Sequence, residues 1–252
     1  MRLANITWPQ ASLYFEKNDT VLMGIGSIEC HGRHNALGTD MIIPDKLISM
    51  MEDKIDVLIA PTLPYGSTDS LEDFPGTINL SDEVFYQVMK KIVVSLQKHG
   101  AKKFVFMNGH GGNVKVLQKI CLELDDTGCL GTIINWWLLA WDLNPKWKGG
   151  HGGAEETAAL MAVDKDLVDL KEIASYEFKD IAKNLKQTGY YTVNFKGIDM
   201  MIPRKISSIT DNGWVGNDHP QNANEKWGKE MLEACAEYIV SYIKAFKEIE
   251  VK

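Results

Sequence analysis

The amino-acid sequence predicts a single α/β domain in which a mostly parallel β-sheet is covered by helices on both faces. Short apolar runs alternate along the chain with longer segments whose apolar residues recur every three or four positions. This is the pattern of buried parallel strands joined by helices. No internal repeat, low-complexity tract or Ser/Pro-rich linker interrupts the alternation, so residues 1–252 are expected to form one domain.

Four apolar runs are expected to form the sheet. They are short and continuous rather than alternating, as in strands whose two faces are both buried. The segment 190–206 is expected to add a further strand or a hairpin. The four predicted strands of the sheet cover residues 21–26, 57–64, 104–108 and 131–137.

Helices are expected between and after these strands. The clearest one has Ser81 as its N-cap, two acidic residues in its first turn and Gly100 beyond its end, and its apolar face should pack on the sheet. Pro44 is placed in the first turn of an earlier helix. Besides the helix that follows Ser81, the predicted helices cover residues 44–53, 114–124, 153–163 and 224–246.

Composition excludes several functions. The net charge of -7 argues against a nucleic-acid-binding protein, because no excess of cations is available to neutralise phosphates. No apolar run is long enough to cross a bilayer, and the N-terminus lacks the apolar core of a signal peptide. The four cysteines form no CxxC pair, so free thiols in a reduced cytoplasmic setting are expected. Cys30 is expected to pack or to support the site, since no base is dedicated to it.

Three polar clusters each come after a predicted strand. Residues 27–40 (SIECHGRHNALGTD) follow the first strand, residues 108–113 (NGHGGN) follow the third, and residues 151–157 (HGGAEET) enter a helix after the fourth. Four of the six histidines lie in these segments. Because ligands bind beyond the carboxyl ends of the strands in parallel α/β sheets, the three clusters are expected to converge on one site.

The residue types in these clusters indicate a metal site. Glu29 and His31 are two residues apart, so in extended backbone their side chains point to the same side. Asp40 can bridge two cations, and the glycines around His110 let the backbone approach them closely. Imidazole with carboxylate suits Zn, Mn or Fe(II), and the lack of thiolates argues against a structural zinc. Each motif alone has an ordinary alternative, such as a tight turn with Asn113 as N-cap, but all three at strand ends favour the metal site.

With these motifs the sequence resembles the creatininase (creatinine amidohydrolase) superfamily. The resemblance rests on the three clusters, on DFPGT at residues 73–77 and on GWVGND at residues 213–218. It implies an α/β sheet fold, a dinuclear metal centre and hydrolysis of cyclic amide C–N bonds or related substrates. It also implies a homo-oligomer, often a hexamer.

Carried over residue by residue, the resemblance implies roles for six side chains. Creatininase proper has a glutamate ligand two residues after the histidine of the NGH motif, where this chain has Gly112. Either Glu156 supplies the missing carboxylate or one metal is held less fully. His151 matches a histidine assigned to acid/base work, and either His151 or Glu156 is expected to shuttle the proton to the leaving group. The implied metal ligands are Glu29, His31, Asp40 and His110, with Asp40 as the bridge and Glu156 as the further candidate.

The expected function is therefore metal-dependent hydrolysis of a small, cyclic substrate such as a creatinine-like amide or a lactam. Two divalent ions, with Zn expected first and Mn or Fe as alternatives, would share a hydroxide that attacks the substrate carbonyl. Alternatives are ring-opening C–C hydrolysis of a cyclic keto-sugar or inositol derivative, deformylation of a pyrimidine precursor, and a non-catalytic metal- or ligand-binding protein. Candidate substrate contacts are Asn135, Trp136, Trp137, Asp69, Glu72 and Arg33.

Overall fold

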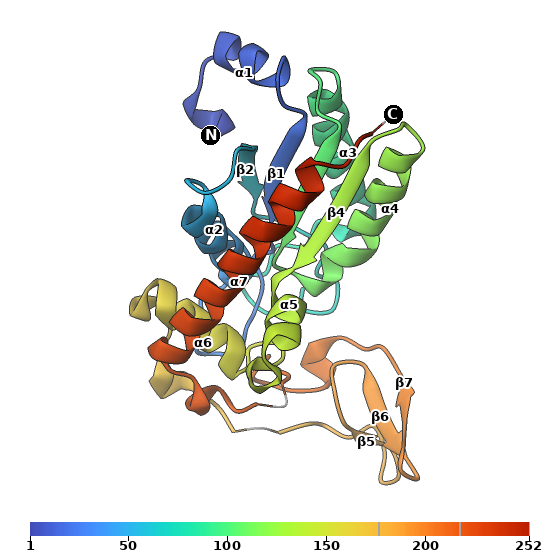
Figure 1. Cartoon of the computed structure of the whole chain (residues 1–252). Coiled ribbons are helices and arrows are strands. Elements are labelled where there is room, and N and C mark those ends of the chain that lie inside the picture. Colours follow the sequence, from blue (N-terminus) through green and yellow to red (C-terminus); the bar gives the residue numbers. More distant parts are fainter. Residues whose placement is uncertain (176, 217, 252) are drawn as a thin grey trace.

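A four-stranded parallel sheet forms the centre of the computed structural model, which describes residues 1–175, 177–216 and 218–251. The strand order is β2-β1-β3-β4 (Figure 1). Strand β3 pairs in continuous register with β1 and β4, for example Ile25 beside Asn108 and Asn108 beside Asn135, whereas the pairing of β1 with β2 shifts register between Met23 and Ile25. The strands are β1 (Thr20–Ile25), β2 (Leu58–Leu63), β3 (Lys103–Asn108) and β4 (Leu130–Asn135).

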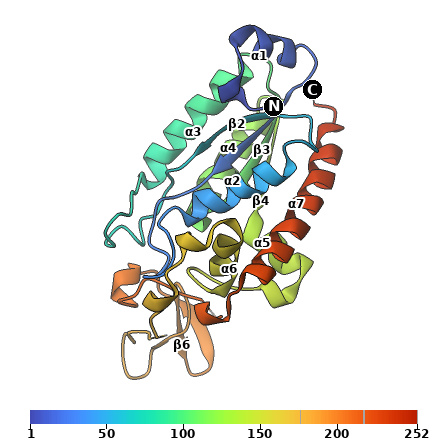
Figure 2. The same ribbon diagram turned by 90° about the vertical axis from the view of Figure 1, so that its left-hand side faces the viewer.

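Helices cover both faces of this sheet, as the sequence predicts (Figures 1 and 2). One face packs against α3 (Ser81–Gln97) and α4 (Val114–Asp125), and the apolar residues of these helices form one core with β1 and β3. The opposite face carries a second core. Its helices are α2 (Thr39–Met51), α5 (Trp136–Leu143), α6 (Ala154–Val163) and α7 (Glu225–Lys247).

A small antiparallel sheet lies outside the two layers. It contains β5 (Lys186–Gln187), β6 (Thr192–Phe195) and β7 (Ile198–Met201), and we call residues 186–201 the hairpin sheet. It projects from the body near the carboxyl ends of the parallel strands (Figure 1). The expected hairpin within residues 190–206 is thus confirmed.

The helix α1 (Trp8–Phe15) lies at the opposite, amino end of the strands (Figure 1). It was not predicted, although Thr7 and Gln10 form a capping box at its start. Its Tyr14 hydroxyl donates to the Thr20 carbonyl and accepts from the Leu58 N–H, which fixes the helix to the sheet. Short 3₁₀ helices cover Leu3–Asn5, Gly111–Asn113, Pro145–Trp147, Lys165–Leu167, Leu170–Glu172, Ile206–Ser208 and Pro220–Asn222.

Three expected boundaries are wrong. The helix placed at residues 44–53 begins at Thr39, so Pro44 lies inside α2 rather than in its first turn. The strand placed at residues 131–137 ends at Asn135, and the chain continues as α5. The prediction is wrong here because a continuous apolar run does not distinguish a strand from a buried helix. Ser81 is the first residue of α3 rather than its N-cap, and its N–H donates to the Asn79 side chain.

Within the described ranges, no helix combines the length and the apolar content needed to span a membrane.

Candidate metal centre

The first candidate ligands follow two neighbouring strands, β1 and β3, and lie at one edge of the sheet. The chain leaves β1 at Ile25 and reaches Glu29 and His31, whereas it leaves β3 at Asn108 and reaches His110. Because β2 and β3 flank β1 on opposite sides, the connections diverge here, which makes this edge a natural ligand site. All three side chains are buried, with 0% of Glu29, 0% of His31 and 7% of His110 exposed.

The proline inside α2 helps to place Asp40 at the same edge of the sheet as the other candidate ligands. Asp40 lies in the first turn of α2 and is 2% exposed. Pro44 has no N–H to offer the Asp40 carbonyl, so that carbonyl is free of its usual helical bond. Gly109 packs directly on it, and a Cβ at position 109 would lie 1.9 Å from the Asp40 oxygen. This close approach brings the start of α2 against the loop that carries His110.

Helix α6 contributes the remaining candidates. Glu156 lies in its first turn, and its Oε2 accepts a 2.7 Å hydrogen bond from the Gly152 N–H. Asp218 caps the same helix from far along the chain, because its Oδ2 accepts the Glu155 N–H at 3.0 Å. His151 precedes the helix, and its carbonyl accepts the Val215 N–H at 2.7 Å. Val215 and Asp218 therefore fix the start of α6.

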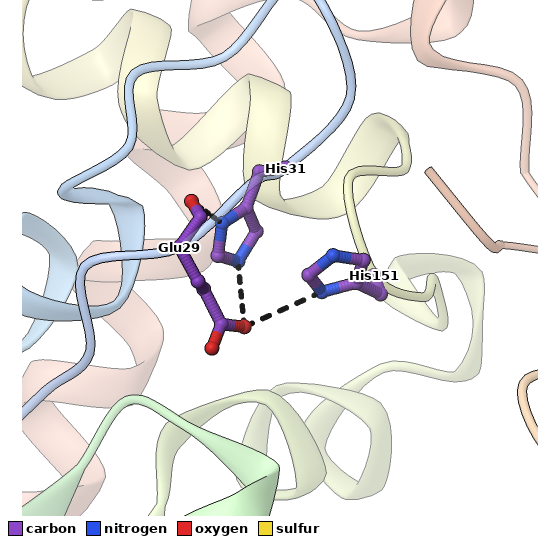
Figure 3. A group of neighbouring side chains, drawn as sticks. All are labelled: Glu29, His31 and His151. Carbon is purple, nitrogen blue, oxygen red and sulfur yellow. Dashed lines mark hydrogen bonds and ion pairs between the residues drawn. The ribbon is translucent and has the colours of Figure 1, made fainter. Parts of the chain in front are cut away.

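Asp40 lies between two histidines. Its Oδ1 is 3.0 Å from His31 Nε2, and its Oδ2 is 3.1 Å from His110 Nδ1. Glu29 Oε1 is also 3.1 Å from His110 Nδ1, and Glu156 Oε2 is 3.7 Å from His31 Nε2. The donor atoms form three overlapping groups. Two of them share Asp40: Glu29, Asp40 and His110 in one, and His31, Asp40 and Glu156 in the other. The third consists of Glu29, His31 and His151 (Figure 3).

Backbone carbonyls fix which nitrogen of each imidazole faces the site. His31 Nδ1–H donates to the Glu29 carbonyl at 3.1 Å, and His110 Nε2–H donates to the Ser67 carbonyl at 2.7 Å. In neutral imidazoles the inward nitrogens, His31 Nε2 and His110 Nδ1, then carry lone pairs. These lone pairs face carboxylate oxygens, an arrangement that repels unless a positive charge lies between them.

Unpartnered buried atoms show that the donor set fits metal ions. Glu29 Oε1, His31 Nε2 and Asp40 Oδ2 are buried and have no hydrogen-bond partner in the described part of the chain. Leaving such atoms unsatisfied costs free energy. Oxygen and imidazole nitrogen donors at this spacing are the ligands that Zn, Mn and Fe(II) accept. The residues present therefore fit two divalent ions.

The electrostatics of the two ligand histidines point the same way. Burial alone lowers the pKa of His31, but the charges of Asp40, Glu156 and Glu29 outweigh it and raise this pKa to about 10. Glu29 and Asp40 likewise raise the pKa of His110 well above its usual value against the effect of burial. The carboxylates therefore create a strongly negative electrostatic potential at both inward nitrogens. A divalent cation bound there would neutralise it.

His151 differs from the other two histidines. Burial, followed by the charge of His31, lowers the pKa of His151 to about 3, so its ring is neutral near pH 7. Its Nε2–H donates to the Cys30 carbonyl at 2.7 Å, and its Nδ1 lies 3.8 Å from Glu29 Oε1 (Figure 3). The unprotonated Nδ1 therefore faces the site and presents its lone pair there.

Gly112 has no room for a side chain in this backbone. A Cβ there would lie 2.2 Å from the Ser67 carbonyl and 2.4 Å from His110 Nε2. A side chain at this position would displace the hydrogen bond that orients His110. Glu156 is the carboxylate that reaches His31 and Asp40 instead.

A cavity of about 570 Å³ opens over these residues. Trp137 lines it, as expected, but Trp136 is fully buried in the core and Asn135 accepts a hydrogen bond from Asn108. Lining residues that sequence reasoning did not single out include Ser67, Thr68, Ser70, Lys115, Trp141, Glu155, Tyr190 and Tyr191.

Of the polar residues predicted to contact the substrate, only some line the cavity. Asp69 lines the cavity. Glu72 pairs with Lys205, and Arg33 pairs with Glu172 at 2.7 Å; neither is among the cavity-lining residues, so both expectations are wrong. Cys30 packs with Leu71, Ile206, Ile209 and Val215, and burial raises its pKa to about 11. A buried, protonated thiol is a packing residue and a poor nucleophile.

The fold and the site together define an α/β protein with a buried carboxylate–imidazole centre at the carboxyl edge of a parallel sheet. The chain belongs to the creatininase family, because the family model for creatinine amidohydrolase matches residues 4–243. It is thus a hydrolase of the creatininase family.

Characterised relatives act on different compounds. A mycofactocin precursor peptide peptidase of Mycolicibacterium smegmatis is 33% identical over 231 residues, covering 87% of this chain and 83% of the relative. A creatinine amidohydrolase of Pseudomonas putida is 28% identical over 197 residues, covering 69% of this chain and 76% of the relative.

Solved structures of creatininases share the fold. A mutant creatininase described as the Zn–Zn type has a TM-score of 0.76 at 23% identity and covers 98% of each chain. A creatininase described with Mn also has a TM-score of 0.76 at 23% identity, covering 98% of this chain and 99% of that one. At this level of identity the similarity establishes the fold.

Proposed function

We propose that the chain is a metal-dependent hydrolase that cleaves an amide C–N bond with a pair of divalent cations. His31, Asp40 and Glu156 would hold one cation, and Glu29, Asp40 and His110 the other. The observation that carries this proposal is Asp40, whose two buried oxygens face the inward nitrogens of two different histidines. Zn is the first expectation and Mn the second, in line with the Zn–Zn and Mn forms of the solved relatives; Fe(II) suits the same donors.

The chemistry divides between the cations and the protein. When bound, the cations would lower the pKa of water and polarise a substrate carbonyl. His151 would accept and return a proton at Nδ1, because its Nε2–H is fixed on the Cys30 carbonyl and its ring is neutral. Glu156 is the alternative proton carrier: burial raises its pKa to about 7, but a ligand role leaves its carboxylate less free for that task.

The first substrate candidate is a small cyclic amide or lactam, because the creatinine amidohydrolase relative acts on such a compound. Creatinine itself is expected to be hydrolysed weakly or not at all, since Gly112 replaces the glutamate of creatininase proper. The second candidate is a peptide amide. It is favoured by the peptide peptidase relative and by the cavity of about 570 Å³, which is within the range of roughly 300–1,000 Å³ for drug-sized ligands.

A metal analysis combined with a substrate screen tests the proposal. The purified chain should carry two transition-metal ions, measured by plasma mass spectrometry. A panel of cyclic amides, lactams, short peptides and cyclic keto-sugars should reveal a hydrolysed class. Removal of the ions by a chelator should abolish turnover, and Zn or Mn should restore it. A chain that holds no transition metal after reconstitution would refute the proposal, and keto-sugar cleavage would favour the ring-opening alternative.

We also infer that copies of the chain assemble into a homo-oligomer. The four residues of β7 are exposed at the edge of the hairpin sheet, and three of them are large and apolar. Ile198 is 67% exposed and Met201 73%. An open strand edge with apolar side chains is a favourable place for association.

A further inference from the structure

The connection between β5 and β6 brings two tyrosines to the metal centre. Tyr190 and Tyr191 both line the cavity, although the hairpin sheet projects from the body (Figure 1). The ring of Tyr190 meets His151 edge-on, with centroids 5.7 Å apart and an interplanar angle of 81°. His151 also packs on His31, with ring centroids 4.3 Å apart. Tyr190 thus lines the cavity beside His151 and next to the candidate ligands, where it is placed to contact a bound molecule.

The hydroxyl of Tyr190 is paired with another hydroxyl. Its oxygen lies 2.8 Å from Ser70 Oγ, and both residues line the cavity. Two hydroxyls have two protons between them, and each oxygen has two lone pairs. One proton forms the hydrogen bond between them, whereas the second has no acceptor among the residues that the structure describes. The pair thus keeps one O–H donor for a molecule in the cavity.

Both hydroxyls are held in place by their backbones. The Ser70 carbonyl accepts the Ile206 N–H at 2.8 Å. On the other side, the Gln187 side chain donates to the Gly189 carbonyl at 2.7 Å and accepts from Arg204 at 2.6 Å. Because these contacts order the turn that carries Tyr190, the donor is pre-organised and costs little to position on binding.

We propose that Tyr190 is a substrate-binding residue that donates a hydrogen bond to an acceptor oxygen away from the scissile amide, while Ser70 donates to Tyr190. The inference rests on the proposed function and narrows its substrate class to amides that carry a second acceptor, such as a carboxylate. We assign the hydrogen bond to the substrate to Tyr190 rather than to Ser70, because a phenol is a stronger hydrogen-bond donor than an aliphatic alcohol.

Two hydroxamates test this proposal without turnover, because the hydroxamate group chelates divalent cations. Acetohydroxamate has no second acceptor, whereas succinohydroxamate carries a carboxylate. Isothermal titration of the Zn-loaded chain should show tighter binding of succinohydroxamate. Tyr190→Phe should weaken its binding about ten- to hundredfold, as expected when a hydrogen bond to a charged group is lost, and leave acetohydroxamate binding unchanged.

Two further variants complete the experiment. Tyr242→Phe is the matched control, because the Tyr242 hydroxyl forms the same kind of pair with Thr132 at 2.7 Å on a helix that does not line the cavity. Both it and Ser70→Ala should keep the preference for succinohydroxamate. The proposal is overturned if wild type shows no preference, if Tyr190→Phe keeps it, or if Ser70→Ala alone removes it. If acetohydroxamate does not bind to the wild-type chain, the proposal of a metal centre is refuted, and the inference about Tyr190 is refuted with it.

Discussion

The two walls of the cavity are built in different ways. The wall that holds the candidate ligands comes from strand ends and first helical turns, and Glu29, Asp40 and His110 are at most 7% exposed. By the other wall we mean the part of the lining that Tyr190 and Tyr191 of the hairpin sheet contribute. Strand β7 of this sheet is exposed along its whole length. Ligands must be held within a fraction of an ångström, which buried regular elements achieve. Surface segments vary more readily among relatives. We therefore propose that the body specifies the chemistry and that the hairpin sheet adapts it to a substrate.

The strongest test of this division is the substitution Asp40→Asn. Asn keeps the size of the side chain but removes the charge shared by both ligand groups, so both ions should be lost. We expect a loss of at least about a thousandfold in kcat/KM, because the cations supply several kcal/mol of transition-state stabilisation. Plasma mass spectrometry should find less than one ion per chain.

The matched control for Asp40→Asn lies on the same helix. Asp45 accepts a hydrogen bond from Thr62 and is not among the residues that line the cavity. Asp45→Asn should retain both ions and most of the activity. Two ions retained in Asp40→Asn would show that the body does not hold its ligands through a shared carboxylate.

A pair of neighbouring glycines sharpens the comparison within the body. In Gly112→Ala the new Cβ collides with the Ser67 carbonyl and with His110, so the hydrogen bond that orients His110 is lost. Loss of such a supporting contact lowers metal affinity by about ten- to a hundredfold. Zn affinity, measured by competition with a chromogenic chelator, should show this decrease.

Gly111→Ala is the control for this experiment. A Cβ at position 111 meets no atom of the described chain within 4 Å, and the backbone change is the same Gly-to-Ala substitution. Its Zn affinity should equal that of wild type. Equal affinities in the two variants would mean that Ser67 does not orient His110.

A smaller effect is expected at Asp218, which caps α6 in the body. Asp218→Ala should remove the cap, destabilise the helix start by about 1 kcal/mol and weaken the ion held by Glu156 several-fold. Asp218→Asn keeps an acceptor oxygen and should restore most of that affinity. Stepwise Zn titration separates the two ions, and equal weakening of both would argue against a role through Glu156.

The sequence predicts the body better than the hairpin side, for physical reasons. Continuous apolar runs indicate buried strands, and polar residues directly after them indicate one edge of the sheet, where the structure brings Glu29, His31 and His110 together. Asp40 lies with them, but the sequence does not predict that it belongs to a helix. Pro44 is typical of a helix start, so the predicted helix begins at Pro44, whereas α2 begins at Thr39. The helix α5 is missed since WWLLAWDL is apolar on every side, and apolar content alone does not distinguish helix from strand.

Contacts between distant segments set the remaining features. Tyr190 meets Ser70 across 120 positions, and Asp218 meets Glu155 across 63. Neither pair has a periodicity or a motif that would predict the contact. The choice between Glu156 and position 112 as carboxylate donor likewise depends on the Ser67 carbonyl, which approaches Gly112 only in the folded chain.

The smallest effect on the chain itself is expected at the far edge of the hairpin sheet. Ile198→Lys places a charge on a residue that is 67% exposed, so the free energy of unfolding should change by no more than about 0.5 kcal/mol. If β7 forms the contact between copies, light scattering after gel filtration should show a smaller assembly, because a lysine at a strand edge opposes pairing. Zn content should stay at two ions, since the ligands lie in the body. An unchanged assembly would place the interface elsewhere, whereas a loss of ions would show that the two walls are not independent.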